Sequence, residues 1–383
     1  MTDWLTAKQA MEALGVRPQT LYAYVSRGRV EARARDDDPR KSVYRAADIE
    51  RLARRKARGR AAAAVAEEAI AWGEPVLPSA ITTVSHGRLY YRGEDAAALA
   101  GRETLEAVAA RLWGAAVDPF DRRPGPIPDG RDPRARMFAS LAARAAADPP
   151  ARRRAPDVLH AEAASLLDGL ADAVAGAPGV GRIHQRLARS GGCGEDGADL
   201  IRRALVLLAD HELNASTFAA RVAASTGASL AAAALAGLAA LSGPLHGGMA
   251  ARVQAFMDEV SRRGPHRAIA ARQDQALPIP GFGHPLYPEG DPRARALLDA
   301  FAPPPLFAET EAAVAALTGE PPNIDFALTA LAERLDLPPE APFLLFATGR
   351  CAGWLAHALE QVAAGRLIRP RARYVGPAPD SAA

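Results

Sequence analysis

Apolar residues recur every three to four positions through most of the chain, in segments separated by glycine or proline. This spacing predicts helices that bury one face. The predicted helices cover residues 104–114, 158–174, 197–224, 227–241, 248–262, 307–318, 324–335 and 342–363. Residues 79–84 predict a short strand, which a turn-like stretch at 86–93 follows. From about residue 75 onward the chain is therefore predicted to be mainly α.

The first thirty residues predict two helices joined by a short turn. Thr6 can cap a helix that ends at Gly15, and Pro18 suits the start of a second helix that ends at Gly28. A short extended piece and a basic helix follow in SVYRAADIERLARRKARGR. The stretch resembles the winged helix-turn-helix of MerR-like regulators and excisionases, which implies a DNA-reading unit over residues 1–58. The alternative is a small helical docking domain that binds no DNA.

Composition distinguishes three other segments. Residues 59–74 predict a helical linker, and residues 118–157, rich in Pro, Arg and Asp, predict a long excursion on the surface. Residues 227–245 carry no charge and have the length of a membrane span. They are mostly alanine and glycine, which gain little from lipid, so they predict a buried helix and no contact with a membrane.

Charge is distributed unevenly along the chain. Residues 1–60 contain 15 Lys and Arg and 8 Asp and Glu, a net charge of +7, whereas the remainder contains 32 and 36, a net charge of −4. We therefore expect different partners for the two parts, with DNA contact through residues 1–60. Cys193 and Cys351 are the only cysteines, which gives no disulfide framework and no metal quartet. Together with the lack of a signal-peptide pattern, this predicts a cytoplasmic protein.

Three of the eight histidines lie in unusual local sequence. His211 opens HELNASTFAARVAAST, which is helical by period and crowds polar groups into a buried turn. His246 lies in SGPLHGGM, where glycines allow backbone to approach a ligand before a helix begins. His284 lies in the proline-braced stretch GFGHPLYPEGDPR (281–293), which matches no helix or strand pattern. A satisfied helix terminus for His211 and a tight helix corner for His246 are the alternatives.

One carboxylate and two arginines complete the candidate chemistry. Asp325 opens a predicted helix in PPNIDFALTALAERL, where an N-cap is the alternative role. Arg293 offers a fork suited to a carboxylate, and Arg350, inside an apolar helix, needs an anionic partner. The sequence has no metal-ligand spacing and no Ser or Cys nucleophile motif. A carboxylate, neutral histidines and arginines indicate proton abstraction next to a carbonyl on a polycarboxylate substrate.

Six motifs then follow one another in the order of the citrate synthase family: HELNAST, GPLHGG, GFGHPLYPEGDPR, NIDF, the arginine of GRCAGW, and RPRARYVG. SHGRLYYRG, nearer the N-terminus, resembles the family's N-terminal turn. The resemblance spans residues 75–377. It leaves the basic N-terminal region outside, as in citrate-synthase-like bacterial proteins that carry a helix-turn-helix extension.

The resemblance implies condensation of acetyl-CoA with oxaloacetate, an acyl transfer in which citryl-CoA is then hydrolysed to citrate and CoA. It implies no metal and no cofactor besides the co-substrate acetyl-CoA. The implied catalytic residues are Asp325 as the base, His246 as the donor to the thioester oxygen, and His284 as the group that polarises and protonates the oxaloacetate carbonyl. The implied oxaloacetate-binding residues are His211, Arg293, Arg350 and Arg369, the last of which would reach the neighbouring subunit's site.

The resemblance also implies a homodimer with a large helical domain (75–249 and 338–383) and a small mobile helical domain (250–337) that closes over oxaloacetate. Two alternatives remain open at this stage: a 2-methylcitrate synthase that uses propionyl-CoA, and a DNA-binding regulator whose synthase domain senses a metabolite. One position departs from the family pattern. Pro288 stands where relatives often have a basic residue that binds CoA phosphates, so the resemblance leaves the choice of acyl-CoA open.

Overall fold

The computed structural model describes residues 4–16, 18–26, 30–35, 38, 41–50, 52–53, 77–116, 120, 127, 130, 132–372 and 374–376. The chain divides into two compact units, residues 1–78 and 79–383, and each has its own hydrophobic core. The predicted linker at 59–74 lies outside the described residues.

The first unit contains the predicted pair of helices and a small sheet. Helix α1 (Ala7–Leu14) begins at the Thr6 cap, whose side chain accepts the Gln9 N–H, and it ends at Gly15 with φ 57°. Helix α2 (Pro18–Ser26) begins with proline, as predicted. Strands β1 (Trp4–Thr6), β3 (Ser42–Arg45) and β2 (Ala32–Ala34) form an antiparallel sheet in that order. The predicted end of α2 at Gly28 lies outside the described residues.

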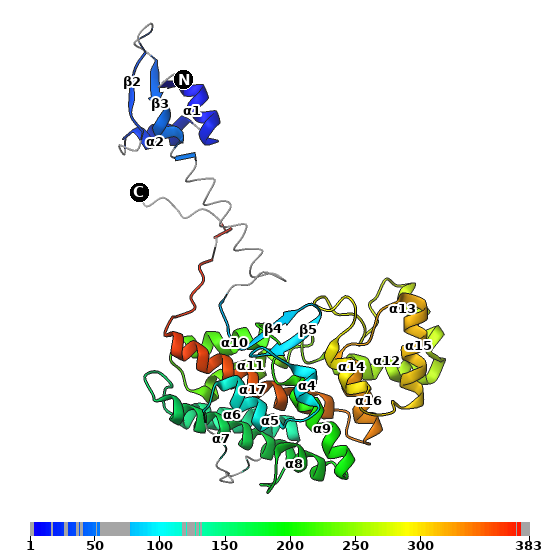
Figure 1. The fold of residues 1–383 in the computed structure, drawn as a ribbon. Coiled ribbons are helices and arrows are strands. Elements are labelled where there is room, and N and C mark those ends of the chain that lie inside the picture. Colours follow the sequence, from blue (N-terminus) through cyan, green and yellow to red (C-terminus); the bar gives the residue numbers. More distant parts are fainter. Residues whose placement is uncertain are drawn as a thin grey trace. The chain divides into compact units, whose positions relative to one another are not determined.

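The second unit is mainly helical, as the sequence predicted (Figure 1). It opens with a sheet of β4 (Thr82–Ser85), β5 (Arg88–Tyr91) and β6 (Glu94–Asp95) in that order. The helices that follow are α4 (Ala96–Ala100), α5 (Leu105–Trp113), α6 (Pro133–Ala147), α7 (Pro156–Ala175), α8 (Ile183–Ser190), α9 (Glu195–Leu208), α10 (Ala215–Ser225), α11 (Leu230–Leu241), α12 (Met249–Arg263), α13 (Pro265–Gln273), α14 (Pro292–Leu298), α15 (Pro305–Thr318), α16 (Ile324–Arg334) and α17 (Ala341–Ala364).

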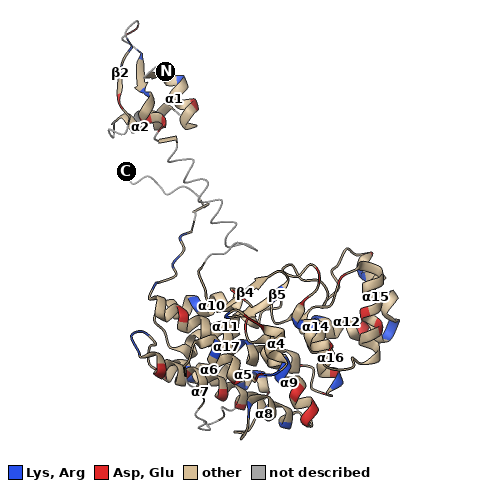
Figure 2. Cartoon of the chain, in the orientation of Figure 1, with Lys and Arg blue, Asp and Glu red and all other residues tan. Residues whose placement is uncertain are grey.

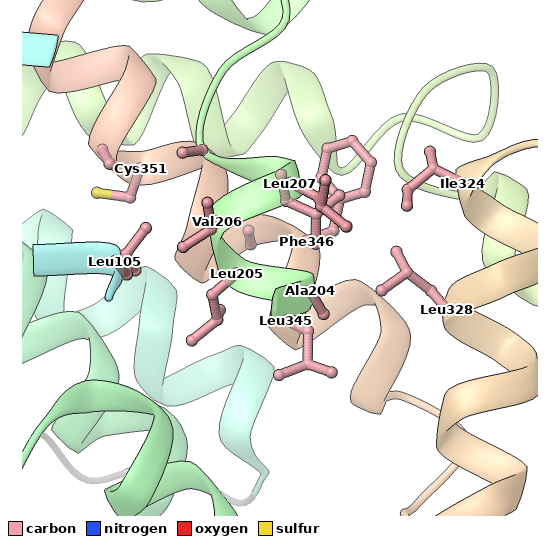
Figure 3. Close-up of a cluster of buried hydrophobic side chains, with 14 of the residues drawn as sticks. Leu105, Ala204, Leu205, Val206, Leu207, Ile324, Leu328, Leu345, Phe346 and Cys351 are labelled. Carbon is pink, nitrogen blue, oxygen red and sulfur yellow. The ribbon is translucent and has the colours of Figure 1, made fainter. Parts of the chain in front are cut away.

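Helix α17 is the centre of this unit. It is 24 residues long and packs against α5, α7, α9, α10, α11 and α16. Figure 3 shows its side chains meeting those of α9 and α16 in one apolar cluster, which includes Leu207, Ile324, Leu328 and Phe346. Two glycines let α17 approach α9 closely. A Cβ at Gly349 would lie 2.8 Å from the carbonyl oxygen of Leu205, so a larger residue there would force the helices apart.

Helices α12–α16 gather at one side of the second unit, away from α5–α8 and α11 (Figure 1). Helix α11 is the charge-free helix predicted from residues 227–241, but it buries only part of its surface, because several of its alanines are half-buried or exposed. Among the described residues, no helix combines the length and apolar character that a membrane crossing requires.

The prediction of a surface excursion at 118–157 was wrong for much of its length. Residues 133–147 form α6, which Asp132 caps by accepting the Ala135 N–H, with Pro133 in the first turn. The helix buries Met137 and Leu141. These two side chains, four residues apart, face the core, but the arginines on the other faces of α6 obscured the pattern.

The prediction of one helix over 197–224 was also wrong. The chain leaves helical geometry between α9 and α10, and Asn214 starts α10 by accepting the N–H groups of Ser216 and Thr217. His211 therefore lies in the bend before α10 and outside any helix. Helices α8, α13 and α14 were not predicted. They have 8, 9 and 7 residues, and such short helices contain too few turns to show a period.

Candidate active site

Two segments that are 40 residues apart in sequence pair to build one wall of the site. The Gly283 N–H donates to the Pro321 carbonyl at 2.9 Å, and the Asn323 N–H donates to the Gly281 carbonyl at 2.8 Å. The Asn323 side chain also donates to the Gly283 carbonyl at 3.0 Å. Gly281 and Gly283 have φ of 87° and 68°, which favours glycine at both positions. The pairing fixes the start of the loop that carries His284 beside the start of α16, which carries Asp325.

The hydrogen bonds of His284 define its tautomer. The Leu286 N–H donates to Nδ1 at 3.1 Å. Burial lowers the pKa of His284 to about 4, and Arg293 adds to this shift, so the ring is neutral at pH 7. A neutral ring that accepts at Nδ1 carries its hydrogen on Nε2. His284 therefore presents an N–H donor, which suits the polarisation of a carbonyl.

His211 meets His284 and Tyr287 in the interior. The rings of His211 and His284 are 5.4 Å apart, edge to face. Nε2 of His211 is 2.9 Å from the hydroxyl of Tyr287. Burial, together with Arg293 and Arg350, holds the pKa of His211 well below its ordinary value. The structure thus brings together two histidines that are 73 positions apart in the sequence.

His246 lies in a tight corner between α11 and α12, as one of its two interpretations predicted. A Cβ at Gly248 would lie 2.7 Å from Pro244 Cα, so this close approach requires glycine. Nε2 of His246 is 2.9 Å from Ser216 Oγ, and the Trp354 indole N–H donates to the same Ser216 oxygen at 3.1 Å. Burial lowers the pKa of His246 to about 4, with Arg350 adding to the shift. A third neutral imidazole therefore belongs to the site, beside His284 and His211.

Asp325 is a half-buried carboxylate that does not cap its helix. Asn323 is the N-cap of α16 and accepts the Asp325 N–H at 3.1 Å, so the N-cap interpretation of Asp325 was wrong. Within the described residues, no hydrogen bond reaches the Asp325 carboxylate. Burial raises its pKa to about 6, although Arg293 and Arg350 oppose the shift. A carboxylate with this pKa is ionised at pH 7 and suited to accept a proton.

Arg293 is held by a carboxylate of the chain itself. Its Nε and Nη2 donate to the two carboxylate oxygens of Asp291 at 2.9 and 2.7 Å, and Arg293 is 3% exposed. Asp291 also accepts the Ile324 N–H at 3.1 Å. Asp291 was not among the predicted site residues, although its place in DPR at the start of a helix was an available signal. The two bonds leave Nη1 of Arg293 outside the pair, as the group that can reach a ligand.

Arg350 is buried without an anionic partner. It is 1% exposed inside α17, and its Nε donates to the Leu208 carbonyl at 3.0 Å. Its Nη2 is buried and makes no hydrogen bond to any described residue. Burial lowers its pKa to about 10, with Asp210 opposing the shift, so Arg350 stays charged. A buried guanidinium nitrogen without an acceptor is costly unless a ligand supplies one.

Tyr91 of strand β5 fixes the end of α9, just before His211. Its hydroxyl lies 3.0 Å from the Val206 carbonyl and 3.1 Å from the Leu207 carbonyl, and accepts the Asp210 N–H at 3.3 Å. The sequence analysis noted the alternation of Leu89 and Tyr91 but gave Tyr91 no role. An aromatic residue in a predicted turn was the available signal for such a role, because a tyrosine that becomes buried needs a hydrogen-bond partner for its hydroxyl.

Arg369 is separate from the other predicted residues. It is exposed in the segment after α17, where the N–H of the preceding Ile368 donates to Ser225 Oγ at 3.1 Å. The structure thus brings six of the seven predicted site residues into one region, linked by direct contacts or by electrostatic influence on one another's pKa values. In the described part of the chain, no cluster of His, Cys, Asp and Glu is arranged to hold a metal ion.

Residues 136–371 match the family model described as "Citrate synthase, C-terminal domain", and residues 4–57 match one described as "Helix-turn-helix domain". The fold is mainly helical and is preceded by a helix-turn-helix unit. The first match covers more than half of the chain, so the chain belongs to the citrate synthase family.

Relatives and solved structures agree with this assignment. The chain is 42% identical over 189 residues to putative citrate synthase 2 of Mycobacterium tuberculosis, which is 46% of this chain and 51% of that protein. It is 37% identical over 200 residues to citrate synthase 2 of Bacillus subtilis, which is 47% of this chain and 51% of that protein. The chain therefore spans about half the length of the curated relatives it matches.

Citrate synthase of Thermotoga maritima superposes with a TM-score of 0.63 at 26% identity, over 81% of this chain and 96% of that chain. The ternary complex of Thermoplasma acidophilum citrate synthase with carboxymethyl coenzyme A and oxaloacetate superposes with a TM-score of 0.65 at 24% identity, over the same shares. At this level of identity, the similarity to the second structure shows the shared fold alone.

Proposed function

We propose that this protein condenses acetyl-CoA with oxaloacetate and hydrolyses the resulting citryl-CoA to citrate and CoA. The observation that carries the proposal is the half-buried Asp325 carboxylate, with a pKa raised to about 6, in a site that also holds neutral histidines and two buried arginines. An ionised carboxylate can remove a proton from the acetyl methyl group, and neutral imidazoles can donate hydrogen bonds to the oxygens on which charge develops.

Each histidine has a part in the proposal that matches its state. In the proposal the Ser216 hydroxyl donates to Nε2 of His246, so the ring carries its hydrogen on Nδ1. His246 donates from Nδ1 to the thioester oxygen while Asp325 takes the methyl proton, which stabilises the enol. The enol carbon then attacks the ketone of oxaloacetate, and His284, with its hydrogen on Nε2, polarises that ketone and gives it the proton. His211, Nη1 of Arg293 and the unpartnered Nη2 of Arg350 bind the carboxylates of oxaloacetate.

The proposal includes a homodimer in which Arg369 reaches the neighbouring subunit's oxaloacetate. Helix α11 supports the dimer, because five of its apolar residues spaced along one side are half-buried or exposed: Ala232, Leu235, Ala236, Ala239 and Ala240. A second copy of the same helix is an apolar surface that would cover them. We also propose that residues 250–337, which contain α12–α16, act as the small domain that closes over oxaloacetate.

The first test of this function measures which acyl-CoA the protein uses. Purified full-length protein is expected to release free thiol from acetyl-CoA only when oxaloacetate is present, as measured with a thiol reagent. The same assay with propionyl-CoA tests the alternative, 2-methylcitrate synthesis. One methylene changes kcat/KM by about 10- to 200-fold, so the larger kcat/KM identifies the donor. No thiol release from either thioester at millimolar oxaloacetate would reject both activities.

Pro288 makes this comparison informative. It is exposed next to Glu289, and a cavity of about 200 Å³ lined by Glu289 and Arg295 lies beside it. Proline offers no charge to a CoA phosphate. Arg295, whose side chain is 71% exposed and 4.0 Å from Asp299, is the neighbouring cation that we propose takes that part. If Arg295 does not bind a CoA phosphate, the KM for every acyl-CoA should be elevated.

A second function, DNA binding, is favoured by the helix-turn-helix match at residues 4–57 and the net charge of +7 over residues 1–60. In the second unit, by contrast, Lys and Arg are interspersed with Asp and Glu along the helices (Figure 2). A basic unit with this motif suits a duplex, whereas a mixed surface does not attract one.

Duplex binding by the full chain is expected to weaken steeply with salt, because each phosphate contact releases counterions. Replacing Arg27 and Arg29, which lie outside the described residues, by alanine should weaken binding and reduce the salt slope by about 1 to 2 in log–log units. Fluorescence anisotropy with a random duplex provides the measurement. Removing the same charge from α12, with Arg262→Ala and Arg263→Ala, is the matched control. No binding at low salt would reject this function.

A further inference from the structure

Tyr287 lies in the middle of the candidate site but has no part in the chemistry described so far. It is 1% exposed, and its hydroxyl is 2.9 Å from Nε2 of His211. Its ring centre is 4.9 Å from that of His284, and the Arg293 guanidinium carbon is 5.7 Å from the ring centre. One side chain therefore touches three of the groups proposed to surround oxaloacetate.

In the hydrogen bond between Tyr287 and His211, one direction of donation is favoured. Burial raises the pKa of Tyr287 well above its ordinary value, so the phenol keeps its hydrogen, and His211 is neutral. Among the described residues, Nε2 of His211 is the hydrogen-bond partner of the Tyr287 hydroxyl. If Nε2–H donated instead, the buried phenol O–H would be left without an acceptor among the described residues, which is unfavourable. Donation from Tyr287 to Nε2 avoids this arrangement.

A neutral imidazole that accepts at Nε2 carries its hydrogen on Nδ1. No hydrogen bond to a described residue uses Nδ1 of His211. Nδ1 of His211 then carries an N–H that can donate to an anionic oxygen. In the other tautomer, Nδ1 would carry a lone pair, which repels an anionic oxygen. The tautomer of His211 thus decides whether it can hold a carboxylate at all.

We propose that Tyr287 is a positioning residue for oxaloacetate, because its hydroxyl donates to Nε2 of His211 and holds the Nδ1–H of that ring toward a substrate carboxylate. This inference rests on the proposed function. The same hydrogen bond ties the loop of His284 to the bend of His211, two segments 76 residues apart. It therefore joins the two halves of the site as well as setting the state of one ring.

Tyr287→Phe separates this role from packing, because phenylalanine keeps the ring against His284 and loses only the hydroxyl. We expect the dissociation constant for oxaloacetate, measured by titration calorimetry, to rise by about 2- to 13-fold, the factor that corresponds to one hydrogen bond of about 0.5–1.5 kcal/mol. The KM for oxaloacetate should rise similarly, and kcat should change less than about threefold, since Tyr287 touches neither reacting carbon in this scheme.

Tyr90→Phe is the matched control, because Tyr90 is half-buried on strand β5 and has no part in the proposed site. Its dissociation constant for oxaloacetate should equal that of the unaltered chain. An unchanged affinity in Tyr287→Phe, with the fold intact by circular dichroism, would overturn the inference.

The tautomer gives a readout that needs no turnover. Long-range proton–nitrogen spectra of the ¹⁵N-histidine-labelled full chain should show His211 as the Nδ1–H form, with its signals assigned from their loss in His211→Gln. In the unaltered chain, the Nε2–H form would overturn the inference even if Tyr287→Phe failed to fold. A chain that shows Nδ1–H but releases no thiol would instead reject the proposed function and leave the assigned tautomer standing.

Discussion

Asp325→Asn is expected to lower kcat by about 10²- to 10⁴-fold, because an amide cannot accept the methyl proton and general base catalysis contributes that much. Asparagine has nearly the same shape, and the Asn323 cap of α16 uses the backbone of residue 325, not its side chain. The helix should therefore form normally. The dissociation constant for oxaloacetate should stay within about threefold, since Asp325 is proposed to act on the acyl donor.

The same carboxylate should set the acid limb of the pH profile. An aspartate with a pKa of about 6 is ionised above that pH and loses its charge as the pH falls through it. For the unaltered chain, kcat/KM for acetyl-CoA should thus fall about tenfold for each pH unit below 6, and this limb should vanish in Asp325→Asn.

Asp299→Asn is the control for the charge change, because the Asp299 side chain is 65% exposed at the end of α14. It should leave both kcat and the pH profile unchanged. A kcat for Asp325→Asn within tenfold of the original, in a folded protein, would remove Asp325 from the role of base and with it the main support for the proposed mechanism.

Gly353→Ala is expected to be the most destabilising single-methyl change in α17. A Cβ at Gly353 would overlap the Ala209 carbonyl oxygen and the Asp210 carboxylate. Neither can withdraw easily: Ala209 is main chain, and Asp210 is buried against His357, with Oδ2 3.2 Å from its Nε2. The helices must separate, and overpacking of this kind costs about 3 kcal/mol.

Thermal unfolding followed by far-ultraviolet circular dichroism should show a midpoint lowered by about 5 °C or more in Gly353→Ala. The control is Gly169→Ala in α7, where a Cβ would meet nothing within 4 Å. Alanine favours a helix over glycine by about 1 kcal/mol, so the control should unfold at the same temperature or slightly higher. Equal midpoints for Gly353→Ala and the control would contradict the close contact between α17 and α9.

The sequence predicted the features whose causes are local. The Thr6 cap, the end of α1 at Gly15 and the corner at His246 each depend on residues within a few positions, so the pattern contained them. It also located the buried Arg350, because one charge in an apolar helix is visible without a structure.

The features that the sequence left open depend on partners far along the chain. Tyr287 matters through His211, and Asp291 through both Arg293 and the backbone of Ile324. Neither relationship has a spacing that a single sequence reveals. The break before α10 was hidden for the same reason, since the helical period of residues 197–224 continues across it, and Tyr91, more than a hundred residues earlier, fixes the carbonyls at the end of α9.

The end of α9 has a consequence for the order in which the protein folds. Its last carbonyls are bound by Tyr91, 115 and 116 residues away, and by Arg350, 142 residues away. Closing loops of that length costs entropy before the contact between their ends can stabilise the chain, so such contacts form slowly. The bend that carries His211 should therefore acquire hydrogen-exchange protection among the last segments of the second unit, so that competence to bind substrate arises only when that unit is complete.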